Sequence, residues 1–285
     1  MKALVTGANG QVGQALQATA PSRWTVVAFD RSTMDLADPQ AIRNAILSEG
    51  PDVVFNAGAY TAVDQAEHDQ EMARKVNGEA PGVIAQTLSQ TGGRLVQIST
   101  DFVFDGSRGA PYSVKTKPNP LSIYGATKLL GEKQAGDDAI VCRTSWVYGA
   151  SGRNFVRTML RLFKERESVS VVSDQIGVPT WSRGLAETLW TLAVKDRPGV
   201  FHYQDAGVAS WYDFAIAVQE EALAIGLLSR AIPIEPIRTS QYPTPATRPP
   251  FSVLDTTVTQ AVTGQSPTHW RENLRKMLRE EKKLG

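Results

Sequence analysis

Short apolar runs alternate with longer, helix-length segments through the first half of the chain. The runs are rich in valine, isoleucine and threonine, and they cover residues 3–6, 25–29, 52–56, 94–100 and 139–144. Buried parallel strands have this composition, and a crossover of helix length separates each from the next. The pattern predicts an α/β fold, a Rossmann-type doubly wound parallel sheet built from βαβ units.

The second half of the chain has longer helical patterns and shorter strands. Its expected elements are helices over 154–166, 183–194 and 211–224 and strands over 169–172 and 199–203. Beyond Pro233 the chain is rich in proline, and a final charged helix is expected from about Pro267. We expect residues 1–150 to form mainly the sheet domain and residues 151–285 a smaller C-terminal lobe, with some chain returning to the sheet.

The composition excludes several classes of protein. Thirty basic and 29 acidic residues leave a net charge of +1, without the strongly basic field that nucleic-acid binding needs. No segment approaches the about 20 apolar residues of a membrane span, and the N-terminal apolar stretch is too short for a signal peptide. The single cysteine, Cys142, fits a reducing cytoplasm. Three isolated histidines have no metal-ligand spacing, so we expect no metal.

Three glycines follow the first predicted strand directly. Gly7, Gly10 and Gly13 have the spacing G-x-x-G-x-x-G and open the first predicted helix. At this position the backbone turns tightly and can approach a pyrophosphate at the helix N-terminus. Glycines alone are a weak signal, but their place in the first βα unit predicts a dinucleotide site. The sheet domain would then bind NAD(P), and the C-terminal lobe would bind substrate.

The second predicted strand ends in an acidic residue followed by a basic one. Asp30 lies about 20 residues after the glycine turn, where a carboxylate accepts hydrogen bonds from the adenosine ribose. Arg31 can neutralise a 2′-phosphate, so the pair leaves the choice between NADH and NADPH open. Asp35 and Leu36 could cover the adenine, or Asp35 could instead form a turn or helix cap ahead of Pro39.

Small residues end the third predicted strand. In the segment from Asn56 to Thr61, Ala57, Gly58 and Ala59 leave room for a ligand over the carboxyl edge of the sheet. Asn77, further along the chain, is interpreted as an ordinary helix residue.

The catalytic signal is a tyrosine and a lysine four residues apart at the start of a predicted helix. Tyr124 and Lys128 share one helix face, so the ammonium is expected to lower the pKa of the phenol and favour its use as an acid. Such a pair alone is often an ordinary surface pair. The segment Ser99-Thr100-Asp101, at the end of the fourth strand, supplies a third member, a hydroxyl that can hold a substrate oxygen. The glycine turn, the hydroxyl at the strand end and the tyrosine–lysine pair follow one another in this order along the chain, and together they predict a reductase.

At these residues the chain resembles the dTDP-4-dehydrorhamnose reductases, a branch of the extended short-chain dehydrogenase/reductase superfamily. The resemblance runs nearly end to end. Besides the motifs above, the matching stretches are residues 59–64 (AYTAVD), 99–104 (STDFVF), 143–149 (RTSWVYG), 154–155 (NF), 174–180 (DQIGVPT) and 246–249 (ATRP).

The resemblance implies roles for individual residues. Tyr124 would be the proton donor in the reduction of a keto group on a nucleotide-linked sugar, with Lys128 and Thr100 assisting. The residues expected at the NADPH or NADH cofactor are Gly7, Gly10, Gln11, Val12, Gly13, Asp30, Arg31, Asp35, Leu36, Ala59, Tyr60, Thr61, Tyr124 and Lys128.

The resemblance also implies that the substrate meets Thr100, Asp101, Trp146 and Arg248. These residue types suit a nucleotide sugar, because an indole offers a flat face and an arginine fork matches a diphosphate. For Trp146, plain core packing is an equal alternative on residue type alone.

One departure from the family pattern concerns assembly. Some relatives carry a glutamate in the first helix, in a Trp-Glu-Leu segment, that helps to build a metal-bridged dimer. Here the matching residues are Gln14-Ala15-Leu16, and the methyl group of Ala15 cannot bind a cation. We therefore expect a monomer or a weak homodimer.

Other functions of related proteins fit less well. A nucleotide-sugar dehydratase commonly has Asp-Glu after the threonine, whereas Phe102 follows Asp101 here and cannot transfer a proton. An epimerase, which never releases its cofactor, is excluded less firmly. A non-catalytic NADP-binding subunit, resembling the regulatory subunit of methionine adenosyltransferase, also shares the fold. The intact Thr100, Tyr124 and Lys128 favour an enzyme.

Overall fold

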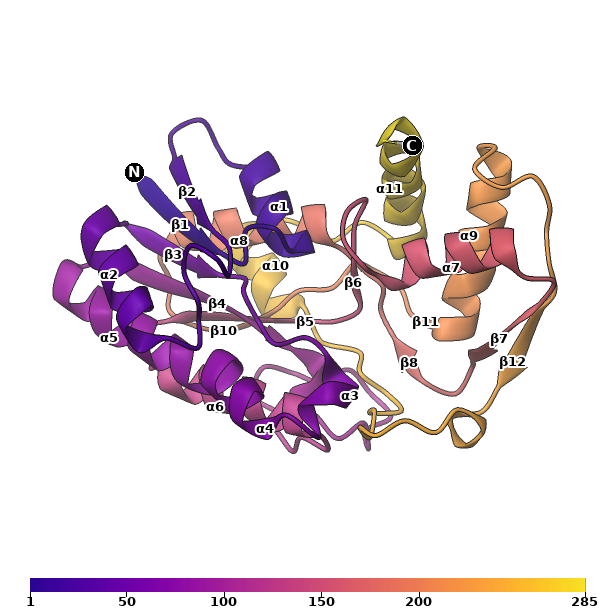
Figure 1. Ribbon diagram of the computed structural model, residues 1–285, viewed down its shortest axis with the longest axis horizontal. Helices are drawn as coiled ribbons and strands as arrows, with labels where there is room; N and C mark the ends of the chain where they lie inside the picture. The colour runs from indigo at the N-terminus through magenta and orange to yellow at the C-terminus, as the bar shows by residue number, and fades with distance from the viewer. Residues whose placement is uncertain (285) are drawn as a thin grey trace.

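A six-stranded, fully parallel sheet forms the larger part of the molecule (Figure 1). The computed structural model describes residues 1–284, and its sheet has the strand order β10-β5-β4-β3-β1-β2. The strands are β1 (Lys2–Thr6), β2 (Thr25–Phe29), β3 (Val53–Asn56), β4 (Arg94–Thr100), β5 (Ile140–Thr144) and β10 (Gly199–His202). The order reverses beside β1, so the switch point of this doubly wound sheet lies between β1 and β3. The predicted Rossmann-type fold is confirmed.

Helices cover both faces of the sheet. One face packs against α2 (Pro39–Glu49), α5 (Ala80–Thr91) and α6 (Ile123–Ala135), and the other against α1 (Gln11–Ala18), α8 (Ser182–Lys195) and α10 (Thr257–Thr263). Short helical segments lie at the carboxyl edge, namely α3 (Val63–Ala66), α4 (Gln70–Ala73), the π-helical η1 (Arg74–Glu79) and the 3-10 turn η2 (Asp101–Val103). Three elements on the sheet, α8, β10 and α10, come from the second half of the chain.

The C-terminal lobe is built from three helices and short strand pairs. Its helices are α7 (Phe155–Glu165), α9 (Trp211–Ala224) and α11 (Trp270–Leu284), and its strand pairs are β6 (Val147–Tyr148) with β9 (Thr180–Trp181), β7 (Val169–Val172) with β12 (Ile234–Ile237), and β8 (Ile176–Gly177) with β11 (Ala209–Ser210). A 3-10 turn, η3 (Thr239–Gln241), follows β12. Phe163, Phe214 and Leu274 are fully buried in the core of this lobe.

The last helix begins later than the sequence pattern predicts. It starts at Trp270 instead of near Pro267, because His269 just before it forms a β-bridge with Ala206.

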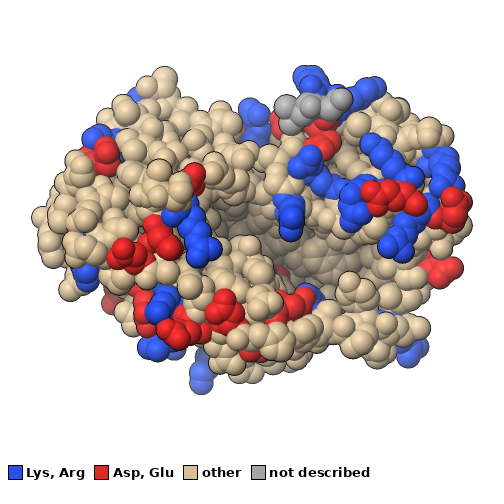
Figure 2. Space-filling view, viewed as in Figure 1, with Lys and Arg blue, Asp and Glu red and all other residues tan. Residues whose placement is uncertain are grey.

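The six-stranded sheet and the helices that cover it are called the sheet half below. Figure 2 shows that the face seen in this view is hollowed between the sheet half and the C-terminal lobe. Within residues 1–284, no helix has the length and apolar character needed to cross a membrane.

Candidate active site

The glycine turn after β1 is too crowded for side chains. Gly7 has φ +63°, and a Cβ there would lie 2.6 Å from the Cα of Gly58. A Cβ on Gly13 would overlap the carbonyl oxygen of Gly7. Gly10 caps α1 without any side-chain hydrogen bond. The first N–H groups of α1 therefore have no side-chain cap, the arrangement that binds a pyrophosphate in dinucleotide-binding folds.

Asp30 lies beside this turn at the end of β2. Its carboxylate accepts hydrogen bonds from Asn9 Nδ2 (2.9 Å), from the backbone and hydroxyl of Ser32 (2.9 and 2.6 Å) and from Thr33. The hydrogen bonds from Ser32 contribute most to lowering the pKa of Asp30, to about 2, so the carboxylate is charged at neutral pH. Arg31 is exposed next to it, and its Nε lies 3.9 Å from Asp35.

Asp35 and Leu36 lie on the loop between β2 and α2. Asp35 Oδ1 accepts a hydrogen bond from the backbone of Ala37 (2.9 Å), whereas the helix cap ahead of Pro39 is Asp38. Of the two open interpretations of Asp35, a local turn describes its contacts. Leu36 is 8% exposed and packs close to Gly58, so it lines the gap between this loop and the end of β3.

The loop after β3 is held by a buried asparagine. Asn77, on η1, accepts a hydrogen bond from the backbone N–H of Tyr60 (2.8 Å) and donates to the Tyr60 carbonyl (3.1 Å). The Tyr60 hydroxyl donates to Asp69 (3.1 Å), and the neighbouring Thr61 is exposed. The interpretation of Asn77 as an ordinary helix residue is wrong, because its side chain fixes the backbone on which Ala59, Tyr60 and Thr61 lie.

Thr100, Tyr124 and Lys128 come together beside the carboxyl end of β4. The Thr100 hydroxyl donates to Asp101 Oδ1 (3.0 Å) and accepts from the backbone of Phe102 (3.2 Å). Phe102 packs edge-on against the Tyr124 ring, with 5.5 Å between centroids. Lys128, one turn after Tyr124 on α6, donates to the Ile98 carbonyl (2.7 Å).

The pKa values of this cluster are governed by burial. Burial raises the pKa of Tyr124 to about 12, against an opposing hydrogen bond with Thr100, and it lowers the pKa of Lys128 to about 8. The prediction of a lowered pKa for Tyr124 is therefore wrong, because burial outweighs the effect of a neighbouring cation. The ammonium is directed to a backbone carbonyl on β4, and loss of hydration dominates at the phenol.

Two of the expected substrate residues border the same edge. Asp101 is 2% exposed, burial raises its pKa to about 6, and its Oδ2 has no hydrogen-bond partner among the described residues. Trp146 has φ 46°, and its ring stacks on Trp211 of α9 at 3.6 Å between centroids. A Cβ on Gly177 would lie 2.6 Å from the Trp146 ring. Trp146, which is only partly buried, thus packs against the C-terminal lobe.

Arg248 forms an ion pair across the two parts of the molecule. Its Nη1 and Nη2 donate to the two carboxylate oxygens of Asp64, on α3, at 3.0 and 2.7 Å. Nη1 also donates to the Thr244 hydroxyl (2.6 Å). The hydrogen bonds from Arg248 hold the pKa of Asp64 below its usual value. The fork expected to meet a diphosphate is therefore directed to a carboxylate of the sheet half.

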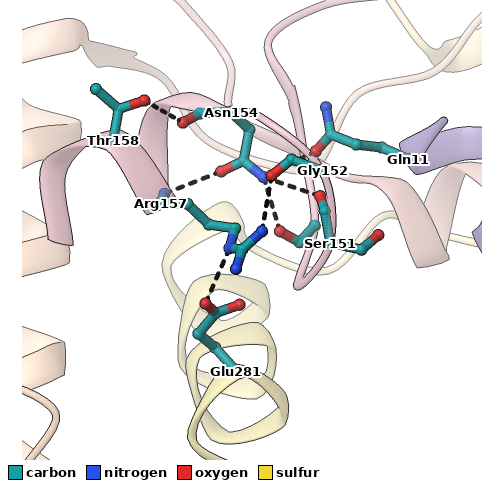
Figure 3. Close-up of polar contacts among 8 residues, drawn as sticks. Gln11, Ser151, Gly152, Asn154, Arg157, Thr158 and Glu281 are labelled. Carbon is teal, nitrogen blue, oxygen red and sulfur yellow. Dashed lines mark hydrogen bonds and ion pairs between the residues drawn. The ribbon is translucent and has the colours of Figure 1, made fainter. Parts of the chain in front are cut away.

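The glycine turn also contacts the C-terminal lobe directly (Figure 3). Asn154, the N-cap of α7, donates from Nδ2 to Gln11 Oε1 (3.0 Å) and to the Gly149 carbonyl (2.8 Å). Arg157 secures the same loop by donating to the Gly152 carbonyl (2.9 Å) and to Glu281 of α11 (2.9 Å). Gln11 thus joins the first turn of α1 to the loop that leads into α7.

Sequence reasoning missed Asn77, Trp211 and Asp64 as parts of this region. Asn77 and Trp211 lie in helical patterns that do not distinguish a hydrogen-bonding or stacking residue from its neighbours. Asp64 stands in one of the matching stretches, yet nothing in its spacing indicates a pairing with Arg248. No cluster of three or more His, Cys, Asp or Glu side chains suited to a metal ion occurs within residues 1–284.

Known proteins match this chain along nearly its whole length. A family model described as the RmlD substrate binding domain matches residues 1–283. The chain is 45% identical to the dTDP-4-dehydrorhamnose reductase of Burkholderia thailandensis, over 95% of this chain and 96% of that protein. It is 37% identical to the enzyme of that name from Salmonella typhimurium, over 98% of both chains.

A solved structure agrees with this assignment. The dTDP-4-dehydrorhamnose reductase of Bacillus anthracis, solved in complex with NADP, matches with a TM-score of 0.93 at 32% identity, over 98% of this chain and 99% of that one. The resemblance noted in the sequence is therefore confirmed, and the chain belongs to the dTDP-4-dehydrorhamnose reductase family.

Proposed function

We propose that this protein reduces the 4-keto group of a nucleotide-linked deoxysugar, dTDP-4-dehydro-L-rhamnose, to give dTDP-L-rhamnose with NADPH or NADH. The observation that carries the proposal is the grouping of Thr100, Tyr124 and Lys128 at the carboxyl edge of β4, in a chain related end to end to such reductases. The sheet edge that holds this group also holds the glycine turn.

The residues at the glycine turn fit a dinucleotide. Gly7, Gly10 and Gly13 keep the turn free of side chains, and the uncapped N–H groups of Gln11, Val12 and Gly13 would hold the pyrophosphate. Asp30 would accept hydrogen bonds from the adenosine ribose, and Arg31 would tolerate a 2′-phosphate. Leu36, Asp35 and the backbone of Ala59, Tyr60 and Thr61 would line the rest of the site. The bound dinucleotide supplies the hydride.

Tyr124 would supply the proton to the carbonyl oxygen. With a pKa of about 12 the phenol is protonated at neutral pH, as a proton donor must be. The Lys128 ammonium would stabilise the phenolate that remains, and the Thr100 hydroxyl would hold the oxygen in place. Carbonyl reduction then needs no further acid, and Phe102 fills the place where a dehydratase commonly has a glutamate.

The substrate sugar would lie between Asp101 and Trp146. The unpartnered Oδ2 of Asp101 is suited to accept a hydrogen bond from a sugar hydroxyl, and the Trp146 ring offers an apolar face. Arg248 would approach the diphosphate from its anchor on Asp64. We further propose that the enzyme works in the cytoplasm as a monomer or weak homodimer, since Ala15 cannot ligate a bridging metal.

The direct test offers the purified protein a panel of nucleotide-linked 4-keto sugars with NADPH or NADH and follows the loss of reduced-nicotinamide absorbance. Stoichiometric consumption with a dTDP-linked 4-keto sugar is expected. Sugar conversion without consumption of added cofactor would favour an epimerase. No conversion, together with co-purification of a transferase, would favour a binding subunit.

A further inference from the structure

A buried polar cluster joins helix α6 to two strands beneath the candidate active site. Glu132 Oε1 accepts hydrogen bonds from the Ser99 hydroxyl on β4 (2.5 Å) and from Arg143 Nε on β5 (2.8 Å). Its Oε2 accepts from Arg143 Nη2 (2.6 Å). Both carboxylate oxygens of Glu132 thus accept hydrogen bonds, and this one side chain links α6 to β4 and β5.

The ion pair in this cluster is withdrawn from water. The side chains of Arg143 and Glu132 are 5% and 6% exposed. The guanidinium lies 5.2 Å from the centre of the Phe104 ring and contacts His202 Nε2 at 3.4 Å. Two apolar residues of similar size often stabilise a protein as well as such a pair, because desolvation opposes the attraction. The pair is therefore weak evidence of added stability, and its charges can act on the groups beside it.

The cluster is adjacent to Lys128. Glu132 follows Lys128 by one turn of α6, and Ser99 follows Ile98, whose carbonyl accepts the Lys128 ammonium. The other charged or titratable groups packed on this part of α6 are Asp101 on η2, Glu67, which accepts the Ile123 N–H, and Arg143 with His202 on the far side of Glu132. Burial lowers the pKa of Lys128, and the charge of Glu132 opposes that shift.

We propose that Glu132 is a positioning residue. Held by Arg143 and Ser99, it fixes α6 against β4 and β5 and keeps the Lys128 ammonium charged at the Ile98 carbonyl. Arg143 in turn donates to both carboxylate oxygens of Glu132 in a dry environment. The inference rests on the proposed function, because it assigns Glu132 a part in reduction through Lys128.

Glu132→Gln is the informative variant, because glutamine keeps the size of the side chain and an acceptor for Ser99 but removes the charge. A nearby opposite charge shifts a pKa by roughly 1–3 units, so the pKa of Lys128 should fall by about one unit when the charge of Glu132 is removed. Lysine is charged below its pKa, which is about 8 in the wild type. The alkaline fall of kcat/KM should therefore begin near pH 7 in the variant instead of near pH 8.

Two further variants separate charge from structure. Glu132→Gln leaves Arg143 buried without a charged partner, so the double variant Glu132→Gln/Arg143→Met provides a neutral pair that can fold. Its pH profile should shift in the same direction as that of the single variant but by less, because loss of the Arg143 cation acts in the opposite direction. Ser99→Ala is the matched control, since it removes a hydrogen bond to Glu132 and keeps both charges. It should keep the wild-type profile even if its Tm falls.

Folding is checked by circular dichroism, and the Lys128 titration is followed directly by NMR of ¹⁵Nζ-labelled lysine. An unchanged Lys128 titration in a folded double variant would overturn the proposal, as would an equal shift in Ser99→Ala. If wild-type protein reduces no 4-keto sugar, the proposed function fails, whereas the NMR titration still decides whether Glu132 sets the charge of Lys128.

Discussion

The sheet half and the C-terminal lobe differ in how far apart their paired strands lie along the chain. In the sheet half, β1 to β5 pair in parallel through helical crossovers, and most of the candidate cofactor residues lie at strand ends or one helix turn beyond them, whereas Tyr124 and Lys128 lie on α6. In the C-terminal lobe, the short strands pair across long stretches of chain, as β7 does with β12. The sheet half presents backbone and polar groups at one edge, whereas the lobe contributes single side chains such as Trp146 and Arg248. We infer that the sheet half carries the chemistry and that the lobe determines how the substrate fits.

Removing the proposed proton donor is the most severe test of the sheet half, to which we assign the chemistry. Tyr124→Phe deletes one hydroxyl and keeps the ring that packs on Phe102. We expect kcat to fall by roughly 10²- to 10⁴-fold, with little change in KM, because the proton moves in the transition state. Steady-state kinetics measure this, and cofactor titration should give a wild-type Kd. Near wild-type kcat would remove Tyr124 from the chemistry.

Asp30→Ala should weaken cofactor binding most, and it also removes the acceptor of the hydrogen bonds from Asn9 and Ser32. A hydrogen bond to a charged group contributes about 1.5–3 kcal/mol, so the Kd for NADH should rise by roughly 10- to 100-fold. The loss for NADPH should be smaller, since Arg31 remains to meet the 2′-phosphate. Fluorescence titration with both cofactors measures the difference. Ser32→Ala, which removes a hydrogen bond within the same turn, is the control, and equal losses for both cofactors in Asp30→Ala would contradict the ribose assignment.

A variant in the lobe should change substrate fit and leave chemistry intact. Trp211→Leu removes the ring on which Trp146 stacks. Aromatic pairs contribute about 0.5–1.5 kcal/mol, so KM for the sugar should rise by roughly 2- to 10-fold with kcat nearly unchanged. Phe155→Leu is the control, because it removes another ring that contacts Trp211 and keeps the stacked pair of Trp146 and Trp211. A fall in kcat larger than the rise in KM would break the proposed division between the halves.

Asn154→Asp probes the contact between the halves. Aspartate can still cap α7, but it cannot donate to Gln11 and Gly149. Each hydrogen bond contributes about 0.5–1.5 kcal/mol, so cofactor affinity should fall by roughly 2- to 10-fold and the free energy of unfolding by about 1 kcal/mol. Thr158→Val, which removes a hydrogen bond to the Asn154 carbonyl only, should leave cofactor affinity unchanged. Calorimetric binding and thermal melts report the two effects.

Metal removal should affect neither half. Because Ala15 stands where some relatives carry a metal-binding glutamate, we expect chelator to leave the oligomeric state and the turnover rate unchanged. Sedimentation and activity before and after dialysis against chelator measure both. Dissociation that magnesium reverses would count against this expectation.

The same contrast explains what the sequence could predict. The strands, the glycine turn and the Thr100, Tyr124 and Lys128 group follow from local spacing, because a parallel sheet brings consecutive strand ends to one edge. Contacts between distant segments, such as Trp146 with Trp211, leave no periodic signal. The sequence predicts the wrong direction for the pKa of Tyr124, because the charge of Lys128 can be read from the sequence and the burial of the phenol cannot.

The late return of the chain to the sheet affects how the protein folds during synthesis. β5 ends at Thr144, but its outer neighbour β10 begins only at Gly199. At about 5–20 residues per second, the ribosome needs several seconds to supply that strand. Throughout this interval β5 is an apolar, unpaired edge, which other strands can join. The outer edge of β5 is therefore the last part of the sheet to be covered during synthesis.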